Sequence, residues 1–166
     1  QFATPANPWI HRETTAREFL EQAGEFDAFV AGIGTGGTLT GVGQVLSEER
    51  PDVRIFGVEP TESPLLSEGH AGPHKIQGLG PNVVPEILDQ NIWDELLHVP
   101  SDDAITYARR AAAEEGLLVG VSSGAALAAI DSLARRSELA GKTIVTVLPD
   151  TGERYLSTPL YSEYLN

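Results

Sequence analysis

The sequence predicts an α/β fold, with a mostly parallel, twisted sheet that carries helices on both faces. Short apolar runs rich in Val, Ile and Phe alternate with helical patterns along the 166 residues, and a glycine-rich turn joins one such run to the helix that follows. Parallel strands need crossover connections, and helices usually supply them. No internal repeat or low-complexity linker divides the chain, so we expect 1–166 to form a single domain.

The first part of the chain has the pattern helix, strand, helix, strand. We expect a helix from about Thr15, with Thr14 as its N-cap and Gly24 as its stop. "FDAFVAGI" predicts a buried strand, because it is apolar, too short for a buried helix and bounded by glycine. "GGTLTGVGQVLSEERP" then predicts a helix, and "VRIFGVEP" predicts a second strand parallel to the first. The apolar face of that helix comprises Leu39, Val42, Val45 and Leu46.

The second part begins with a long stretch, 61–85, that is dense in Gly, Pro, Ser and His and is typical of a functional or flexible loop. "DELLHVP" predicts a short strand, and "SDDAITYARRAAAEEG" predicts a helix capped by Ser101 and ended by Gly116. "GLLVGVSSGAALAAIDSLARRSEL" passes from an extended segment into an alanine-rich helix at Ser122 and Ser123. The β-branched "KTIVTVLPD" predicts the last strand, and a tail follows it.

Composition excludes several classes of function. Eleven Lys and Arg against 24 Asp and Glu give a net charge of −13, which repels nucleic acid and anionic membrane surfaces, so we expect neither as a partner. The chain has no cysteine, which rules out disulfides and thiolate chemistry. No apolar run reaches the roughly 18 residues of a membrane span, and no signal peptide is recognisable, so we expect a cytoplasmic protein. The chain opens on Gln1 and contains no methionine, which indicates a piece of a longer chain.

The turn "VAGIGTGGTLTG" has two competing ligands. Its glycine spacing matches the dinucleotide pattern G-x-G-x-x-G, and Glu59 follows at the place of a ribose-binding acid. Alternatively, the backbone N–H groups of Gly34–Thr38 and the hydroxyls of Thr35 and Thr38 would surround one terminal phosphate monoester. A glycine-rich connection without any ligand is the third interpretation. The three glycines of the dinucleotide pattern are Gly32, Gly34 and Gly37.

Two further sets of polar residues call for interpretation. Ser122 and Ser123 lie where an extended segment meets a helix N-terminus, which suits either N-capping or a hydroxyl directed at a ligand. His70 and His74 are four residues apart, but they stand in a loop rich in proline and glycine and do not share a helix face. We therefore predict no metal site.

Six stretches spread from residue 4 to residue 160 together resemble the cysteine synthase family, the O-acetylserine sulfhydrylases of the fold-type II pyridoxal-phosphate enzymes. They are "TPANPWIH", "AGIGTGGTLTGVG", "GVEPTESPLLS", "GPHKIQGLG", "EEGLLVGVSSGAALAA" and "LPDTGERYLSTPL". The resemblance implies the C-terminal (large) domain of that fold type and pyridoxal 5'-phosphate as cofactor. Ser122 would hydrogen-bond the pyridine nitrogen, and Gly78 would approach the cofactor through its backbone. The residues that would hold the 5'-phosphate are Gly34, Thr35, Gly36, Gly37 and Thr38.

The resemblance also implies a reaction and partners. The reaction is β-replacement, in which O-acetylserine and sulfide give cysteine and acetate. A neutral hydroxyl at the pyridine nitrogen leaves the ring a weaker electron sink than a carboxylate would, which favours loss of a β-substituent over transamination. The partners implied are an amino-acid substrate, sulfide, a second copy in a homodimer, and serine acetyltransferase.

The family's Schiff-base lysine lies in an N-terminal part that this sequence does not contain. Neither Lys75 nor Lys142 stands in that context. We therefore expect no catalytic residue in this chain, and we expect the chain alone to be inactive.

Alternatives remain open at this point. Cystathionine β-synthase and serine dehydratase belong to the same cofactor class, and "LGPNVVP" stands after "KIQG" where family members commonly have a glycine and aromatic stretch, which leaves the activated serine undecided. A nucleotide-binding (NAD) dehydrogenase domain is favoured only by the glycine spacing and Glu59. A third class is a catalytically silent binding half that serves assembly.

Overall fold

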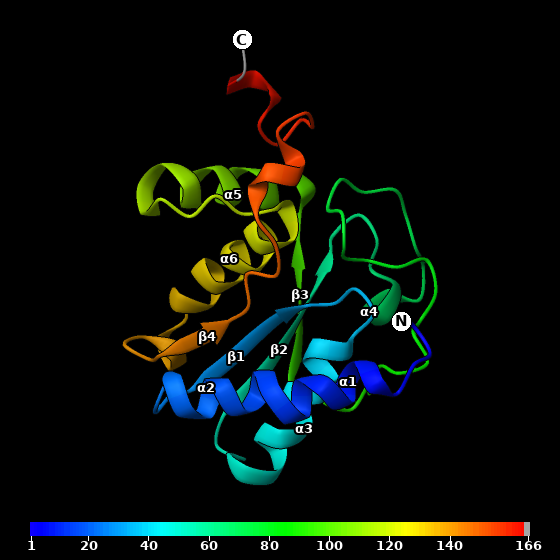
Figure 1. The fold of residues 1–166 in the computed structure, drawn as a ribbon, viewed down its shortest axis with the longest axis vertical. Helices are drawn as coiled ribbons and strands as arrows, with labels where there is room; N and C mark the ends of the chain where they lie inside the picture. Colours follow the sequence, from blue (N-terminus) through cyan, green and yellow to red (C-terminus); the bar gives the residue numbers. More distant parts are fainter. Residues whose placement is uncertain (165–166) are drawn as a thin grey trace.

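The fold is of the α/β class, and its sheet is entirely parallel. The computed structural model describes residues 1–164, and within them four strands pair in the order β3-β2-β1-β4 (Figure 1). The strands are β1 (Ala28–Gly32), β2 (Arg54–Pro60), β3 (Glu95–Val99) and β4 (Ile144–Thr146). All three neighbouring pairs run parallel. The fold class predicted from the alternation of strands and helices is confirmed.

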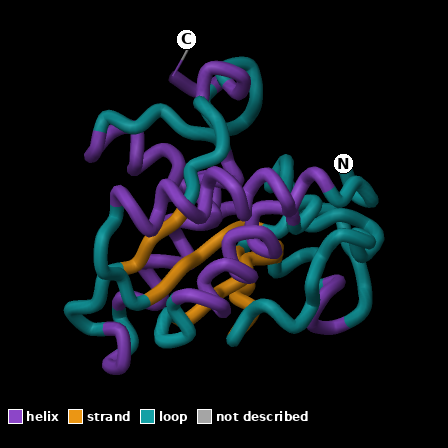
Figure 2. Tube along the Cα trace, turned by 60° about the horizontal axis from the view of Figure 1, so that its bottom comes forward, coloured by secondary structure: helices purple, strands orange, loops and turns teal. Residues whose placement is uncertain are grey.

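Helices cover both faces of this sheet, as Figure 2 shows with the strands between two layers of helix. The α-helices are α1 (Ala6–Ile10), α2 (Ala16–Gln22), α3 (Gly37–Glu49), α4 (Leu65–Glu68), α5 (Ser101–Glu115) and α6 (Val121–Ala134). The other helical turns are the π-helical η1 (His11–Thr15) and the 3-10 turns η2 (Ser137–Leu139), η3 (Gly152–Tyr155) and η4 (Ser162–Tyr164). None of the helices within the described part of the chain is long and apolar enough to cross a membrane.

The two faces of the sheet hold two separate hydrophobic clusters, because successive strand side chains point to opposite sides. Ala28 and Val30 of β1 pack toward α5 and α6, whereas Phe29 and Ala31 pack toward α3 and α2. The predicted apolar face of α3 is fully buried in the second cluster. Because β1 and β2 run parallel, their carboxyl ends meet at one edge of the sheet. The start of α3 follows β1 at this edge.

The N-terminal helical segment begins earlier than the sequence predicts. It starts at Ala6 after Pro5, a residue type favoured at helix starts, and continues through η1 into α2. Thr14 is not an N-cap, because it lies inside the helical segment and its hydroxyl donates to the carbonyl of Ile10 at 2.9 Å. The predicted stop is correct, since Gly24 follows the helix with a φ of 65°.

The cap expected at Ser101 is also wrong. Pro100 precedes α5, and no side chain caps it. The Ser101 hydroxyl instead accepts a hydrogen bond from the backbone N–H of Lys75 at 2.9 Å, so it fastens the 61–85 loop to the helix start. The predicted end of α5 is confirmed, because Gly116 has the left-handed φ of 71° that closes the helix.

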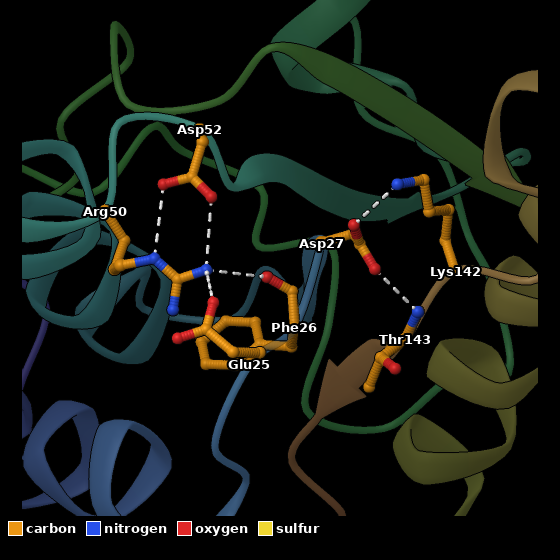
Figure 3. Close-up of polar contacts among 7 residues, drawn as sticks. All are labelled: Glu25, Phe26, Asp27, Arg50, Asp52, Lys142 and Thr143. Carbon is orange, nitrogen blue, oxygen red and sulfur yellow. Dashed lines mark hydrogen bonds and ion pairs between the residues drawn. The ribbon is translucent and has the colours of Figure 1, made fainter.

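Two polar clusters hold the opposite edge of the sheet, where β1 and β4 begin (Figure 3). The carboxylate of Asp27 accepts from the backbone N–H of Thr143 at 2.9 Å and from Lys142 Nζ at 3.0 Å. Arg50, after the end of α3, donates to the carbonyl of Phe26 at 3.2 Å and binds Asp52 in a bidentate pair at 3.1 and 3.2 Å. These contacts fix how β1 lies against its neighbours.

Asp27→Asn is expected to destabilise the chain in a pH-dependent way. The hydrogen bond from Thr143, and then the one from Lys142, hold the pKa of Asp27 below its ordinary value. The stabilisation is therefore complete above the unfolded pKa of about 4 and is lost as the pH falls through the lower folded value. Denaturant unfolding at neutral pH and near pH 2 gives the free energy of unfolding of both proteins. The wild type should have the larger free energy of unfolding at neutral pH only. A difference in stability that persists in acid would contradict the interpretation.

Candidate functional site

A cavity of about 300 Å³ opens at the edge of the sheet where β1 and β2 end. It is lined by the loop after β1, by the 77–79 segment, by the start of α6 and by the segment after β4. All the site residues predicted from the sequence lie in its wall, namely Gly34, Thr35, Gly36, Gly37, Thr38, Gly78 and Ser122. The structure thus gathers into one place residues that come from three distant parts of the chain.

The loop after β1 presents unpaired backbone donors to this cavity. The N–H groups of Gly34, Thr35, Gly36 and Thr38 donate to no protein acceptor within residues 1–164. They precede or open α3, a helix of 13 residues, whose N-terminal end carries partial positive charge. Such an end binds anions, phosphate groups above all.

Glycine is required in this loop on steric grounds. A Cβ on Gly34 would lie 2.2 Å from the carbonyl oxygen of Gly78, and a Cβ on Gly37 would lie 2.1 Å from the side-chain oxygen of Asn7. Gly36 also has a φ of 83°, which L-residues with a side chain rarely adopt. Without side chains at these positions, the backbone of the loop can lie close to its neighbours and form part of the cavity wall.

The two threonine hydroxyls of the loop are held by the N-terminal helical segment. Asn7 Nδ2 lies 2.9 Å from Thr35 Oγ1, and His11 Nε2 lies 3.2 Å from Thr38 Oγ1. Neither Asn7 nor His11 is among the site residues predicted from the sequence. Their positions in "TPANPWIH", a stretch that carries the family resemblance, were the only signal of importance.

The serine pair at the start of α6 does not cap the helix. Gly120 occupies the N-cap position, and no side chain caps it, so the capping interpretation of Ser122 and Ser123 is wrong. Ser122 is 7% exposed and faces the cavity, whereas Ser123 is fully buried and its hydroxyl oxygen has no partner in the described part of the chain. Both serines lie within the first turn because the helix begins at Val121.

Asp150 and Tyr155 form a further polar pair at the cavity, and neither residue was predicted from the sequence. Both line the cavity, and the Tyr155 hydroxyl donates to Asp150 Oδ2 at 2.5 Å. Asp150 Oδ1 is buried without a partner in residues 1–164 and lies 2.1 Å from the position that a Cβ on Gly120 would take. Burial, and then the hydrogen bond to Asp150, raise the pKa of Tyr155 to about 12. An acidic residue four positions after the last parallel strand was the available signal, since ligands gather at that edge.

Glu59 does not serve as a ligand-binding acid at this site. It is 2% exposed, and its carboxylate accepts from the backbone N–H groups of Leu66 at 3.0 Å and Ser67 at 3.2 Å. It also contacts His98 Nε2 at 3.1 Å. Glu59 therefore anchors the start of α4 and lies outside the cavity wall, which removes the acid that the dinucleotide interpretation needs.

The two lysines lie outside the cavity wall as well. Lys75 Nζ is 3.3 Å from Asp102, at the start of α5, and Lys142 Nζ is 3.0 Å from Asp27, at the opposite edge of the sheet. Both lysine side chains are at least half exposed. Neither is buried beside the loop in the way an activated lysine nucleophile would have to be.

Comparison with known proteins gives a consistent set of matches. A family described as "Pyridoxal-phosphate dependent enzyme" matches residues 1–150. A cysteine synthase of Staphylococcus aureus is 53% identical over 165 residues, which cover 98% of this chain and 53% of that protein.

Solved structures agree with the sequence match. An O-ureido-L-serine synthase has a TM-score of 0.92 at 48% identity, covering 97% of this chain and 51% of that one. A cysteine synthase (OASS) from Entamoeba histolytica has a TM-score of 0.93 at 41% identity, covering 97% of this chain and 48% of that one. The chain thus spans about half the length of these relatives.

Proposed function

Because this chain belongs to the family of pyridoxal-phosphate dependent enzymes, we propose that it is the phosphate-binding portion of a cysteine synthase. The proposed reaction is the pyridoxal-phosphate-dependent β-replacement of O-acetylserine and sulfide to give cysteine and acetate. One observation carries the proposal: the glycine loop at the start of α3 and Ser122 at the start of α6 line the same cavity.

The residues of the cavity fit this cofactor in size and in donor chemistry. About 300 Å³ lies at the small end of the range for small-molecule sites. The unpaired N–H groups of Gly34, Thr35, Gly36 and Thr38 and two hydroxyls suit a phosphate monoester, which carries nearly two charges and three free oxygens. The bridging pyrophosphate of a dinucleotide uses fewer donors than a phosphate monoester does. A dinucleotide site also needs an acid that binds the ribose, and Glu59 instead binds the backbone of α4.

Each residue has a distinct proposed task. When bound, pyridoxal phosphate supplies an electron-withdrawing ring that eases loss of a proton and of a leaving group from an amino acid. Thr35 and Thr38 hold the phosphate, and Ser122 offers a neutral hydroxyl to the ring nitrogen, which favours elimination over transamination. Tyr155, whose pKa of about 12 keeps it protonated at neutral pH, donates to Asp150 and fixes that carboxylate in the wall.

We propose that the chain alone is inactive, because neither of its lysines reaches the cavity. Pyridoxal phosphate should bind saturably and reversibly in the cavity, and borohydride should fix it only to exposed amines, in an amount that inorganic phosphate does not change. Absorbance titration followed by borohydride treatment and dialysis, with and without inorganic phosphate, tests this, with NAD as the matched competitor for the glycine loop. Covalent retention that inorganic phosphate suppresses would place a reactive amine in the cavity and overturn the inactivity, and preferential binding of NAD would overturn the proposed function.

Co-expression with an N-terminal half of the Staphylococcus aureus cysteine synthase extends the test. If the two halves make one enzyme, sulfide-dependent cysteine formation should appear only when both halves are present.

Supplying O-acetylserine and O-phosphoserine separately to the co-expressed halves identifies the activated serine. A homodimer, a complex with serine acetyltransferase and a cytoplasmic location are further proposals, supported by the family resemblance.

A further inference from the structure

The amide of Asn7 is held in one orientation. Its Nδ2 donates to the backbone carbonyl of Gln1 at 3.0 Å and to Thr35 Oγ1 at 2.9 Å. A carbonyl oxygen only accepts, so the nitrogen and not the oxygen of the amide must face it. Both amide hydrogens are then used, and one of them is directed at the oxygen of Thr35.

This contact determines where the proton of Thr35 points. Thr35 Oγ1 accepts from Asn7 and, at 3.4 Å, from the backbone N–H of Gly37, which occupies both lone pairs of the hydroxyl. The hydroxyl proton finds no protein acceptor within residues 1–164. Because Thr35 lines the cavity, this proton is available to an anion there.

Thr38 is the end of a similar chain of hydrogen bonds. Thr15 Oγ1 lies 2.8 Å from His11 Nδ1, and His11 Nε2 lies 3.2 Å from Thr38 Oγ1. Burial lowers the pKa of His11, so the neutral ring has one donor and one acceptor nitrogen. If Thr15 donates to Nδ1, the Nε2–H group donates to Thr38, and the proton of Thr38 is left for an anion.

The packing of the N-terminal segment serves these contacts. His11 opens the π-helical turn η1, a rare geometry that is frequent at functional sites. A Cβ on Gly41 would lie 2.7 Å from His11 Cβ and 2.2 Å from the carbonyl oxygen of Pro8, so glycine allows the segment to approach α3 closely. A Cβ on Gly37 would displace the amide of Asn7 in the same way.

We propose that Asn7 and His11 are positioning residues, which turn the hydroxyl protons of Thr35 and Thr38 toward the phosphate bound at the start of α3. The inference rests on the proposed function, since the anion it names is the phosphate of pyridoxal phosphate. On this proposal, the hydroxyl donors that the glycine loop offers to the phosphate are oriented by the N-terminal helical segment. Asn7 and His11 of that segment do not themselves line the cavity.

A double-mutant cycle tests the role of Asn7. Asn7→Ala should lower the affinity for pyridoxal phosphate and for inorganic phosphate about tenfold, the effect of a hydrogen bond to a charged group. In a Thr35→Val background the same substitution should change neither affinity, because the hydroxyl through which it acts is gone. Pyridoxal, which lacks the phosphate, is the control ligand and should bind all four proteins alike.

Conservative rescue tests the role of His11. His11→Gln keeps a side-chain N–H that can reach Thr38 and should retain phosphate affinity to within about twofold, whereas His11→Phe should lose about tenfold. The melting temperature of each free protein separates this effect from a loss of folding. A melting temperature that falls equally in both variants, with equal loss of affinity, would overturn the positioning role.

The outcomes distinguish this inference from the proposed function. Suppose that wild type binds pyridoxal phosphate and that Asn7→Ala lowers this affinity by the same factor with and without the Thr35 hydroxyl. The positioning role is then wrong and the cofactor site stands. If wild type binds inorganic phosphate with the expected coupling but does not bind pyridoxal phosphate, the cofactor assignment is wrong and the positioning role stands. Binding of neither ligand overturns both.

Discussion

Gly34→Ala is expected to lower the affinity for pyridoxal phosphate by about 100-fold. The new Cβ would lie 2.2 Å from the carbonyl oxygen of Gly78, a backbone atom that no side-chain rotation can move. Forcing the glycine loop and the 77–79 segment apart costs about 2–3 kcal/mol, which corresponds to that change in affinity. Titration of the cofactor absorbance gives the dissociation constant, and the melting temperature reports whether the fold survives.

Gly116→Ala is the matched control for this change. Gly116 also has no side chain to lose, but it closes α5 outside the cavity wall, and nothing lies within 4 Å of the Cβ that alanine would add. Its φ of 71° makes alanine cost about 1 kcal/mol of stability, with no effect on cofactor affinity. Equal affinity of Gly34→Ala and wild type would refute the close contact as the reason for glycine in the loop.

Gly124→Ala should cause the largest loss of stability, about 3 kcal/mol in the free energy of unfolding. Gly124 lies in the first turns of α6, where the helix packs against α5. A Cβ there would lie 1.9 Å from the carbonyl oxygen of Ala104 and 2.7 Å from the backbone nitrogen of Ala108. Since both are backbone atoms of a helix, α5 must move as a whole and its buried alanines lose their packing. Denaturant unfolding measures the loss.

Gly69→Ala provides the comparison. Its φ is 78°, and nothing lies within 4 Å of the position of the new Cβ, so only the backbone strain of about 1 kcal/mol is expected. A smaller loss in Gly124→Ala than in Gly69→Ala would show that α5 and α6 are not packed as closely as described. The start of α6 also carries Ser122, so cofactor affinity should fall together with stability in the first variant only.

Local signals in the sequence predicted the elements and the residues of the glycine loop. The alternation of apolar runs with helical patterns sufficed for the fold class, because period and turn chemistry are properties of neighbouring residues. The caps expected at Thr14 and Ser101, and the capping alternative for Ser122, failed for one reason. A cap depends on the residue at which a helix begins, and packing against other elements moved each of these starts by one to several residues.

What the sequence by itself determined is the class of fold and the seven predicted site residues that the structure brings together in one cavity wall. Only the tertiary structure decided that Asn7 meets Thr35, 28 residues away, that Asp150 and Tyr155 line the same cavity as the glycine loop, and that Glu59 is occupied in anchoring α4. The reason is physical: a hydrogen bond between distant segments depends on how helices and strands pack, and no local pattern of residue types records which side chains that packing brings together.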